Sequence, residues 1–294
     1  MNNTVWMILQ SLVNGVMMGG VYALISVGLT IIFGVMKVVN FAQGEYLVIG
    51  MYVTLVLSQL TGLEPYYLLG PVIIIAYVIG HLSFRTVVRP LLGQSGSNFI
   101  IATMGLSFVF QSVLQLIFTS NYLSVESSYK AASIQLGSIS LSTPKVFAFL
   151  AMFVFVCLVN YFLKRTDLGR SMRATSENTM VAQSLGINTT RIYGFSFALG
   201  TTFAAITGLF LTPIYLVYPT VGTTFKSIAM VVIVMGGLGN IGGAVASGLL
   251  CGIVEALVAT FVSNDLSPAA AYLLLILILM FKPQGLFGKG ARTA

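Results

Sequence analysis

Charged residues are scarce in this 294-residue chain, where only 7% are Asp, Glu, Lys or Arg. An average soluble domain carries about a quarter of such residues. In addition, 57% of the residues are apolar and the mean hydropathy is +0.98. This balance excludes a soluble globular domain and predicts a polytopic membrane protein. The net charge of +7 does not indicate nucleic-acid binding, because the basic residues cluster beside the apolar runs, as the positive-inside rule expects.

Side chains that commonly carry enzyme chemistry are equally sparse. The chain has one histidine, His81, and two cysteines, Cys157 and Cys251, which lie within apolar runs without metal or redox spacing. A phosphate-binding loop is missing as well, since Gly288–Gly290 has neither the distant first glycine nor the following hydroxyl residue. We therefore expect no catalytic residue, no metal, no cofactor and no ATP site on this chain.

What the chain does have is long apolar runs. A helix that crosses the roughly 30 Å hydrocarbon core needs about 20 predominantly apolar residues. The runs that qualify are 5–33, 46–61, 66–84, 98–119, 146–163, 192–212, 227–262 and 268–281. Their hydrophobicity is continuous rather than alternating, which favours helices over a β-barrel. The prediction is an all-α polytopic transmembrane helical bundle, one domain over 1–294, with eight or nine spans and glycine-interrupted helices.

Basic residues predict which loops face the cytoplasm. They follow the third run, bracket the segment 164–191 and end the chain, at Arg85, Arg89, Lys164, Arg165, Arg170, Arg173, Arg191, Lys282, Lys289 and Arg292. We therefore expect a multi-pass membrane protein with a cytoplasmic C-terminus and an external N-terminus.

The loop 121–144 then lies outside. It is rich in serine and alternates apolar residues at Ile134, Leu136, Ile139 and Leu141, which predicts a small hairpin. An external connector with local structure is favoured over a landing surface for a solute-binding protein.

The segment 164–191 is polar and basic between two apolar blocks. Thr166 and Asp167 are suited to cap a helix, and Gly186 to end one, so we expect a single helix from about Gly169 to Leu185. One side of this helix carries Met172, Thr175, Thr179, Ala182 and Leu185, which should pack on the protein, whereas Arg170, Arg173, Glu177 and Asn178 lie on other faces. The helix is interpreted as a docking surface for a soluble partner; the alternative is that its arginines only set topology or contact anionic lipid.

A polar knot from Lys37 to Glu45 separates the first two apolar runs. Polar groups at membrane depth are costly unless they pair or line a cavity, so Asn40, Gln43, Gly44 and Glu45 are candidates for an unwound segment on a solute path. An ordinary cytoplasmic loop, with Glu45 capping the next helix, is an equal alternative. The amides of Asn40 and Gln43 offer both donors and acceptors, which suits a zwitterion or an amide.

Glycines interrupt the run 227–262. They permit either a broken helix or very close helix packing, and a broken helix is favoured because Asn240 needs a hydrogen-bond partner. A glycine-interrupted segment in each half of a transporter points to the transport site. The candidates for the solute path here are Gly236, Gly237, Gly239, Asn240, Gly242 and Gly243. Whether Glu255 or Lys226 also lines the path stays open, with Glu255 expected at an interface, paired or capping.

Four stretches together resemble one family. They are GRSMRATSENTMVAQSLGI at 169–187, VVNFAQGEYLVIGMY at 38–52, VVIVMGGLGNIGGAVASGLL at 231–250 and FKPQGLFG at 281–288. They are similar to permease subunits of the high-affinity branched-chain amino acid ABC importers, most of all to the H-type subunit. That family commonly has a histidine where this chain has Gln43, so a role that needs a titrating imidazole is not expected here.

The resemblance implies a transport subunit of a bacterial inner membrane, which binds no ATP itself and depends on partners that use ATP. Those partners are two cytoplasmic ATPase subunits, a second homologous permease and an external solute-binding protein. The residues implied to couple to an ATPase are Gly169, Arg170, Arg173, Ala174, Asn178, Ala182, Leu185 and Gly186. The alternatives are a related urea or short-amide permease and a self-contained secondary carrier, which would favour intramembrane acids or an ion site and would not need the polar segment.

Overall fold

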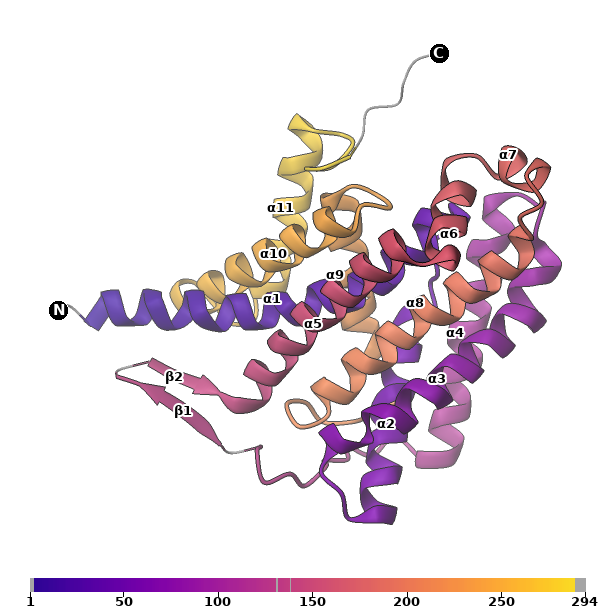
Figure 1. The fold of residues 1–294 in the computed structure, drawn as a ribbon. Coiled ribbons are helices and arrows are strands. Elements are labelled where there is room, and N and C mark those ends of the chain that lie inside the picture. Colours follow the sequence, from indigo (N-terminus) through magenta and orange to yellow (C-terminus); the bar gives the residue numbers. More distant parts are fainter. Residues whose placement is uncertain (1–2, 131, 138, 289–294) are drawn as a thin grey trace.

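The computed structural model describes residues 3–130, 132–137 and 139–288, and about three quarters of these are helical (Figure 1). The elements are α1 Asn3–Met36, α2 Gln43–Thr61, α3 Leu69–Ser83, α4 Gly96–Phe118, β1 Ser133–Leu136, β2 Ile139–Ser142, α5 Thr143–Arg165, α6 Asp167–Glu177, α7 Thr179–Ser184, α8 Thr189–Leu211, α9 Gly222–Gly236, α10 Ile241–Phe261 and α11 Ser267–Phe281. A 3₁₀ turn, Pro65–Leu68, precedes α3, and a π-helical turn, Phe84–Val88, and a second 3₁₀ turn, Arg89–Leu91, continue it.

Seven of the helical segments are long and apolar enough to cross a membrane. They are α1, α2, α3 with its flanking turns, α4, α5, α8 and α10. Two further apolar helices, α9 and α11, have 15 residues each and are shorter than a usual span. The predicted all-α bundle is confirmed, and these nine segments agree with the approximate expectation of eight or nine.

The core of the bundle is formed by α1 and α8, with α2 beside them. In the most apolar stretch of α1 83% of the residues are buried, and in that of α8 89%, whereas only 17% are buried in α4 and 22% in α5. Small residues let the core helices touch backbone to backbone. Gly28 of α1 meets Gly200 of α8, and Gly50 of α2 meets Ala205 of α8. The outer helices therefore present apolar side chains to the surroundings, whereas the central ones have little lipid-facing surface.

This close packing makes a testable prediction at Gly208 of α8. A Cβ atom added there would lie 2.1 Å from the carbonyl oxygen of Leu47, so two backbones would have to separate. We expect Gly208→Ala to destabilise the protein by about 1–3 kcal/mol, the usual cost of overpacking. Gly105→Ala on α4 is the matched control, because nothing lies within 4 Å of its added Cβ. Thermal unfolding in detergent measures both, and equal midpoints for the two variants would contradict close packing of α8 on α2.

The β-hairpin and the α6–α7 segment lie at opposite ends of the molecule (Figure 1). The hairpin predicted in the loop 121–144 is confirmed, with β1 antiparallel to β2 and Ser133 opposite Ser142. It is tied to the beginning of α1, where the Gln10 side-chain amide donates to the Ser140 carbonyl at 2.7 Å and accepts from the Ser140 amide at 2.9 Å. The other end of α1 contacts α6. These two ends are called the hairpin end and the α6 end below.

Glu64 fastens the loop after α4 to the connection between α2 and α3. Its carboxylate accepts hydrogen bonds from the Ser127 hydroxyl at 2.7 Å and the Ser128 amide at 2.9 Å. These bonds favour the charged form and lower the pKa of Glu64 below its ordinary value. These hydrogen bonds to the carboxylate are therefore present at neutral pH and are lost only when the pH falls through that lowered pKa.

Candidate functional site

The polar knot folds back into the bundle instead of forming an open loop. The helix α1 ends at Met36, Lys37 has a positive φ of 57°, and α2 begins at Gln43. Lys37 itself is exposed, whereas Asn40 is 1% exposed and Gln43 and Glu45 are fully buried. Residues 40–45 are therefore unwound or first-turn backbone buried inside the protein, with Glu45 in the first turn of α2. A segment of the solute path and a connection with Glu45 capping the next helix both stay predictions.

The two amides of the knot hydrogen-bond to each other and to the backbone. Asn40 donates from Nδ2 to Oε1 of Gln43 at 3.2 Å, and its Oδ1 accepts from the Ala42 amide at 3.0 Å. Gln43 donates from Nε2 to the carbonyl of Gly200 on α8 at 3.0 Å. These bonds occupy most of the polar atoms of the two side chains. Asn40 and Gln43 therefore hold the unwound segment against α8. Their part in a solute path stays a prediction.

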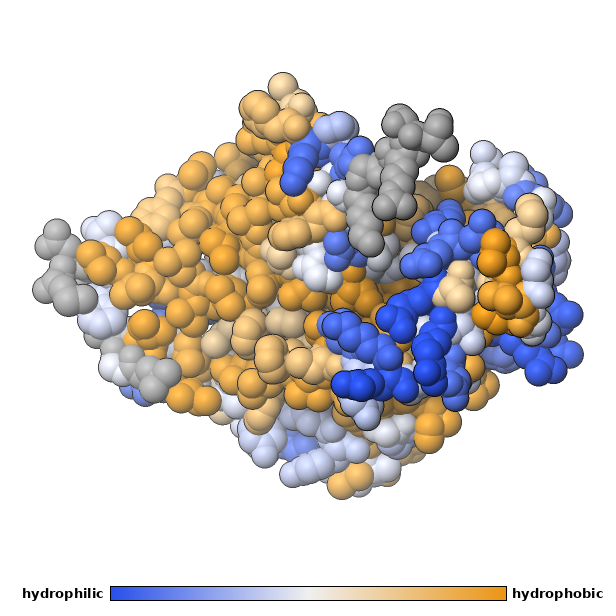
Figure 2. Space-filling model, turned by 45° about the horizontal axis from the view of Figure 1, so that its top comes forward, coloured by the Kyte–Doolittle hydropathy of each residue, from blue (hydrophilic) through white to orange (hydrophobic). Residues whose placement is uncertain are grey.

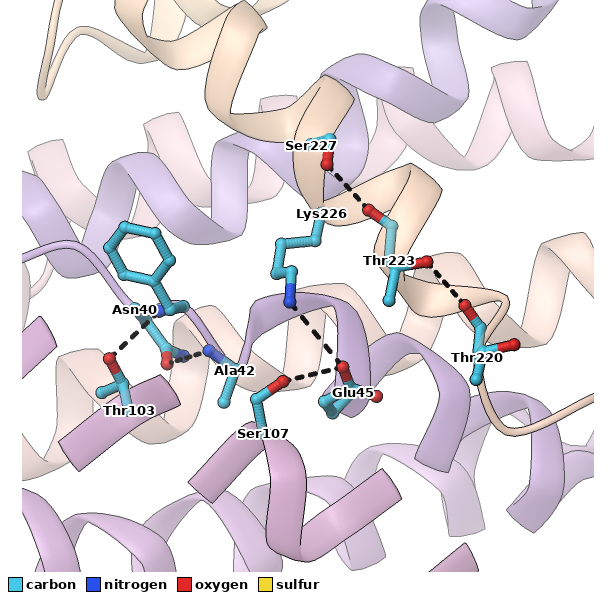
Figure 3. A network of polar contacts seen from close by, with 10 residues as sticks. Asn40, Ala42, Glu45, Thr103, Ser107, Thr220, Thr223, Lys226 and Ser227 are labelled. Atoms are coloured by element: carbon cyan, nitrogen blue, oxygen red, sulfur yellow. Dashed lines mark hydrogen bonds and ion pairs between the residues drawn. The ribbon is translucent and has the colours of Figure 1, made fainter. Parts of the chain in front are cut away.

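Glu45 forms a buried ion pair with Lys226 of α9 (Figure 3). Lys226 Nζ lies 3.9 Å from Oε1 of Glu45, which also accepts a 2.9 Å hydrogen bond from the Ser107 hydroxyl on α4. The Glu45 side chain is 1% exposed and that of Lys226 is 22% exposed, so the pair reaches from the interior to the surface. The second oxygen of Glu45, Oε2, is buried and has no hydrogen-bond partner in the described chain.

The exposed side of α9 extends this site with further polar side chains, which we call the polar face of α9. Thr223 and Thr224 are exposed and Ser227 is partly exposed, all on the same helix as Lys226. Figure 3 shows Thr223 and Ser227 beside Lys226. The hydroxyls of Thr223 and Ser227 hydrogen-bond to carbonyls of the preceding turn, to Thr220 at 2.8 Å and to Thr223 at 2.9 Å. Such bonds lower the cost of placing hydroxyls in an apolar environment. A lysine and three hydroxyls on the open side of one helix nevertheless indicate contact with water or with a polar partner.

Close packing at a glycine pair brings α2 and α9 together. A Cβ at Gly44 would lie 2.2 Å from the Gly222 carbonyl oxygen, and one at Gly222 would lie 2.4 Å from the Gly44 carbonyl oxygen. Only glycine allows the two backbones to approach so closely. The predicted residue Gly44 therefore places Glu45 within reach of Lys226.

The apolar run 227–262 is interrupted, as expected. The helix α9 ends at Gly236 and α10 begins at Ile241, and Gly237 and Gly239 between them have φ values of 95° and 83°. The predicted alternatives both occur, because Gly236 and Gly243 also pack backbone to backbone, while Gly242 is exposed. We call residues 237–240 the glycine loop.

Asn240 has its hydrogen-bond partners at the end of the loop and in the C-terminal segment. Its Oδ1 accepts from the Gly243 amide at 3.0 Å, which caps α10, and its Nδ2 donates to the Phe287 carbonyl at 2.9 Å. Gly239 lies against Gly34 near the end of α1, and it lines a hollow of about 100 Å³ together with residues of α6. The glycine loop therefore borders the α6 segment.

The expectation of one helix from Gly169 to Leu185 is wrong, because the segment forms two helices. Asn178 leaves the helical region with φ −151° and ψ 107°, and its side chain accepts hydrogen bonds from the Met180 and Val181 amides, which starts α7. The two predicted ends are confirmed. The Thr166 hydroxyl caps α6 by accepting from the Gly169 amide at 3.0 Å, and Gly186 has a φ of 82°.

This break changes which side chains are exposed. Met172, Thr175 and Ala182 are buried as expected, and Gly169 packs on α5 at Leu163. Leu185 was expected to pack as well, but it is 75% exposed. It forms an apolar patch on α7 with Met180 and Val181, which are 78% and 54% exposed.

Exposed polar side chains precede this patch on α6 and at the start of α7. Arg170, Arg173, Glu177 and Asn178 are exposed as predicted, and Ala174 is partly buried beneath them. Arg170 pairs with Asp167 of its own helix. Figure 2 shows hydrophilic residues gathered mainly at this end of a largely hydrophobic molecule. An apolar patch with a charged rim is the composition of a protein-docking surface.

Comparison with known proteins shows the family of this chain. A family model described as "branched-chain amino acid transport system / permease component" matches residues 11–282. This chain belongs to that family. It is 31% identical to the high-affinity branched-chain amino acid transport system permease protein LivH of Salmonella typhimurium, with 96% of each chain covered. It is also 31% identical to the corresponding protein BraD of Pseudomonas aeruginosa, again with 96% of each covered.

A more distant relative comes from an archaeon. The chain is 27% identical to a probable branched-chain amino acid transport permease protein LivH of Methanocaldococcus jannaschii, over 90% of this chain and 88% of that protein. No solved structure matches the chain. The family and the apolar helices together make this a multi-pass membrane protein.

Two contacts of Glu45 in this permease were not predicted from its sequence, those with Lys226 and Ser107. Lys226 was visible as a lone cation near a long apolar run, but nothing in the sequence connected it with Glu45, and Ser107 gave no signal at all. Glu255 of α10, expected to be paired or capping, forms no ion pair within the described residues, and its Oε2 has no hydrogen-bond partner there.

Proposed function

We propose that this permease is the membrane subunit of an ATP-driven importer of branched-chain amino acids and forms part of the solute path. The observation that carries the proposal is the family match over residues 11–282, together with the two relatives named as branched-chain amino acid permeases over 96% of the chain. The chain acts as a transport subunit and is not an enzyme; ATP is bound and hydrolysed by partner subunits.

The solute path runs along the open polar face of α9. An amino acid carries an ammonium and a carboxylate, and Glu45 and Lys226 offer one group of each opposite charge 3.9 Å apart. The unpartnered Oε2 of Glu45 has free acceptor capacity for an ammonium. The hydroxyls of Thr223, Thr224 and Ser227 extend this face with further polar groups. Those of Thr223 and Ser227 already donate to backbone carbonyls, so they offer their oxygens as acceptors. Because the face is open on a single chain, a second homologous permease completes the path across it.

The movement of the ATPase subunits is transmitted to the membrane helices through α6 and α7. The apolar patch of Met180, Val181 and Leu185 with its arginine rim docks into one of two cytoplasmic ATPase subunits. Movement of α6 passes directly to the glycine loop and to the end of α1, because Arg173, Gly239 and Gly34 line one hollow. Asn40 and Gln43 lie just beyond that end of α1, and their hydrogen bonds fix the connection from α1 to α2.

This assignment orients the chain in a bacterial inner membrane. The α6 end faces the cytoplasm, and the hairpin end, with the start of α1, faces outside, where a solute-binding protein delivers the amino acid. The segment after α11 supports a cytoplasmic C-terminus, because the Leu286 amide bonds to the Met235 carbonyl at 2.7 Å beside the glycine loop. Lys289 and Arg292, expected on the same side, lie outside the described residues.

Purification of the tagged full chain from gently solubilised native membranes tests the proposal. We expect mass spectrometry of the purified sample to identify an ATPase subunit and a second permease, and the reconstituted assembly to take up leucine, isoleucine or valine only with ATP. Recovery of the chain alone, still active for uptake in liposomes, would instead establish a secondary carrier. Uptake of urea or short amides in preference to leucine would overturn the proposed substrate.

A further inference from the structure

A groove of about 680 Å³ opens at the α6 end, and its lining includes neither the polar residues of α9 nor Met180, Val181 or Leu185. It lies between the end of α3 with its π-helical turn, the beginning of α8, and Leu168 of α6. Three arginines line it, Arg85, Arg89 and Arg191. Its aromatic walls are formed by Tyr77, Phe84 and Phe195, with the ring of His81 stacked on that of Tyr77.

The charge of this groove is uncompensated. None of the described residues that line it is acidic, and none of its three arginines belongs to either of the ion pairs formed within the described chain. The acid closest in sequence to the lining, Asp167, is already paired with Arg170. Three guanidinium groups around one hollow match the several oxygens of a phosphate, which arginine binds through paired hydrogen bonds.

An apolar stripe leads from the bilayer side to these arginines. Ile74, Val78 and Leu82 follow one another at helical spacing on α3 and are 66%, 58% and 58% exposed. The same face continues into Arg85 and Arg89 of the two turns that extend α3. A row of apolar side chains that leads to cations at the edge of a membrane span suits a lipid. The acyl chain packs along the row, and the anionic headgroup meets the cations.

We propose that this groove binds an anionic phospholipid, with the phosphate among Arg85, Arg89 and Arg191 and an acyl chain along the α3 stripe. A soluble ATPase would meet the groove only from the aqueous side and would leave the stripe uncovered. Charge complementarity and the continuous stripe therefore identify the occupant as lipid of the leaflet at the α6 end. This site is separate from the solute path, and its occupancy does not depend on which solute is carried.

Native mass spectrometry of the purified full chain tests the site, with dioleoyl phosphatidylglycerol and dioleoyl phosphatidylcholine as probes. We expect the wild-type chain to retain phosphatidylglycerol in about tenfold preference, and Arg85→Gln with Arg89→Gln to lose that preference. The matched control is Lys164→Gln with Arg165→Gln, which removes two exposed cations of the same end that do not line the groove. Equal preference in the two double variants would overturn the proposal.

Two further measurements separate lipid from the other occupants. Leu82→Gln keeps every arginine but interrupts the stripe, and we expect it to weaken retention of phosphatidylglycerol severalfold. Displacement of the bound lipid by millimolar inorganic phosphate, with no effect of Leu82→Gln, would mean a free-anion site and would refute the lipid. Loss of the ATPase subunit from the Arg85→Gln, Arg89→Gln assembly with lipid retention unchanged would mean a protein interface and would refute it equally. Circular dichroism and gel filtration of each variant check that it is folded.

Discussion

Replacement of Arg173 by glutamate should reduce ATP-driven uptake by the assembled importer about 100-fold, which corresponds to about 2.7 kcal/mol of coupling free energy. Arg173 is exposed on α6, the helix that precedes α7, and it forms no ion pair in the described chain, so its charge is available to a partner. Reversal of that charge places a carboxylate at the interface with the ATPase, where an unmatched charge is costly. Radiolabelled leucine uptake into proteoliposomes measures the effect.

The matched control for this substitution is Lys164→Glu at the end of α5. Lys164 is an exposed cation at the same end of the molecule and lies outside α6 and α7, so its reversal should leave uptake within about twofold of the wild type, as expected of an isolated surface charge. Both variants should insert into the membrane in wild-type amounts. Normal ATP-driven uptake by Arg173→Glu would show that α6 does not dock the ATPase.

The second large effect is expected at the Glu45–Lys226 pair. Lys226→Met leaves the carboxylate of Glu45 buried beside Ser107 without its cation, and loss of one partner of a buried pair costs about 3–5 kcal/mol. We expect a lower unfolding temperature in detergent and uptake reduced at least about 100-fold. A Lys164→Met variant, which removes an exposed cation, should change neither property.

The double variant Glu45→Gln with Lys226→Met separates stability from transport. With both charges removed no buried charge is left unpaired, so the unfolding temperature should return to near the wild-type value, because neutral replacement of a buried pair is often tolerated. Uptake should remain as low as in the single variant, since the charges proposed to meet the ammonium and carboxylate of the solute are gone. Recovery of uptake along with stability would show that the pair only holds α2 to α9.

The features of the fold that follow from local sequence were predictable. Continuous apolar runs gave the membrane helices, and alternation between Ile134 and Leu141 gave the hairpin, since each depends on periodicity within a short segment. Thr166 and Gly186 were likewise predicted as the ends of the α6–α7 segment, because capping needs only the neighbouring residues. The break at Asn178 was missed, although its capping side chain is itself a local signal.

The sequence by itself determined the class of the molecule, its helical spans, its polar segment and its family. These properties rest on composition, periodicity and residue order, which need no knowledge of the contacts between distant segments. Only the tertiary structure decided that Glu45 meets Ser107 and Lys226, that Asn40 and Gln43 hydrogen-bond inward, and that Leu185 turns outward. The reason is that backbone contacts at small residues, such as Gly44 on Gly222, set the register between helices, and pairings between distant residues follow from that register.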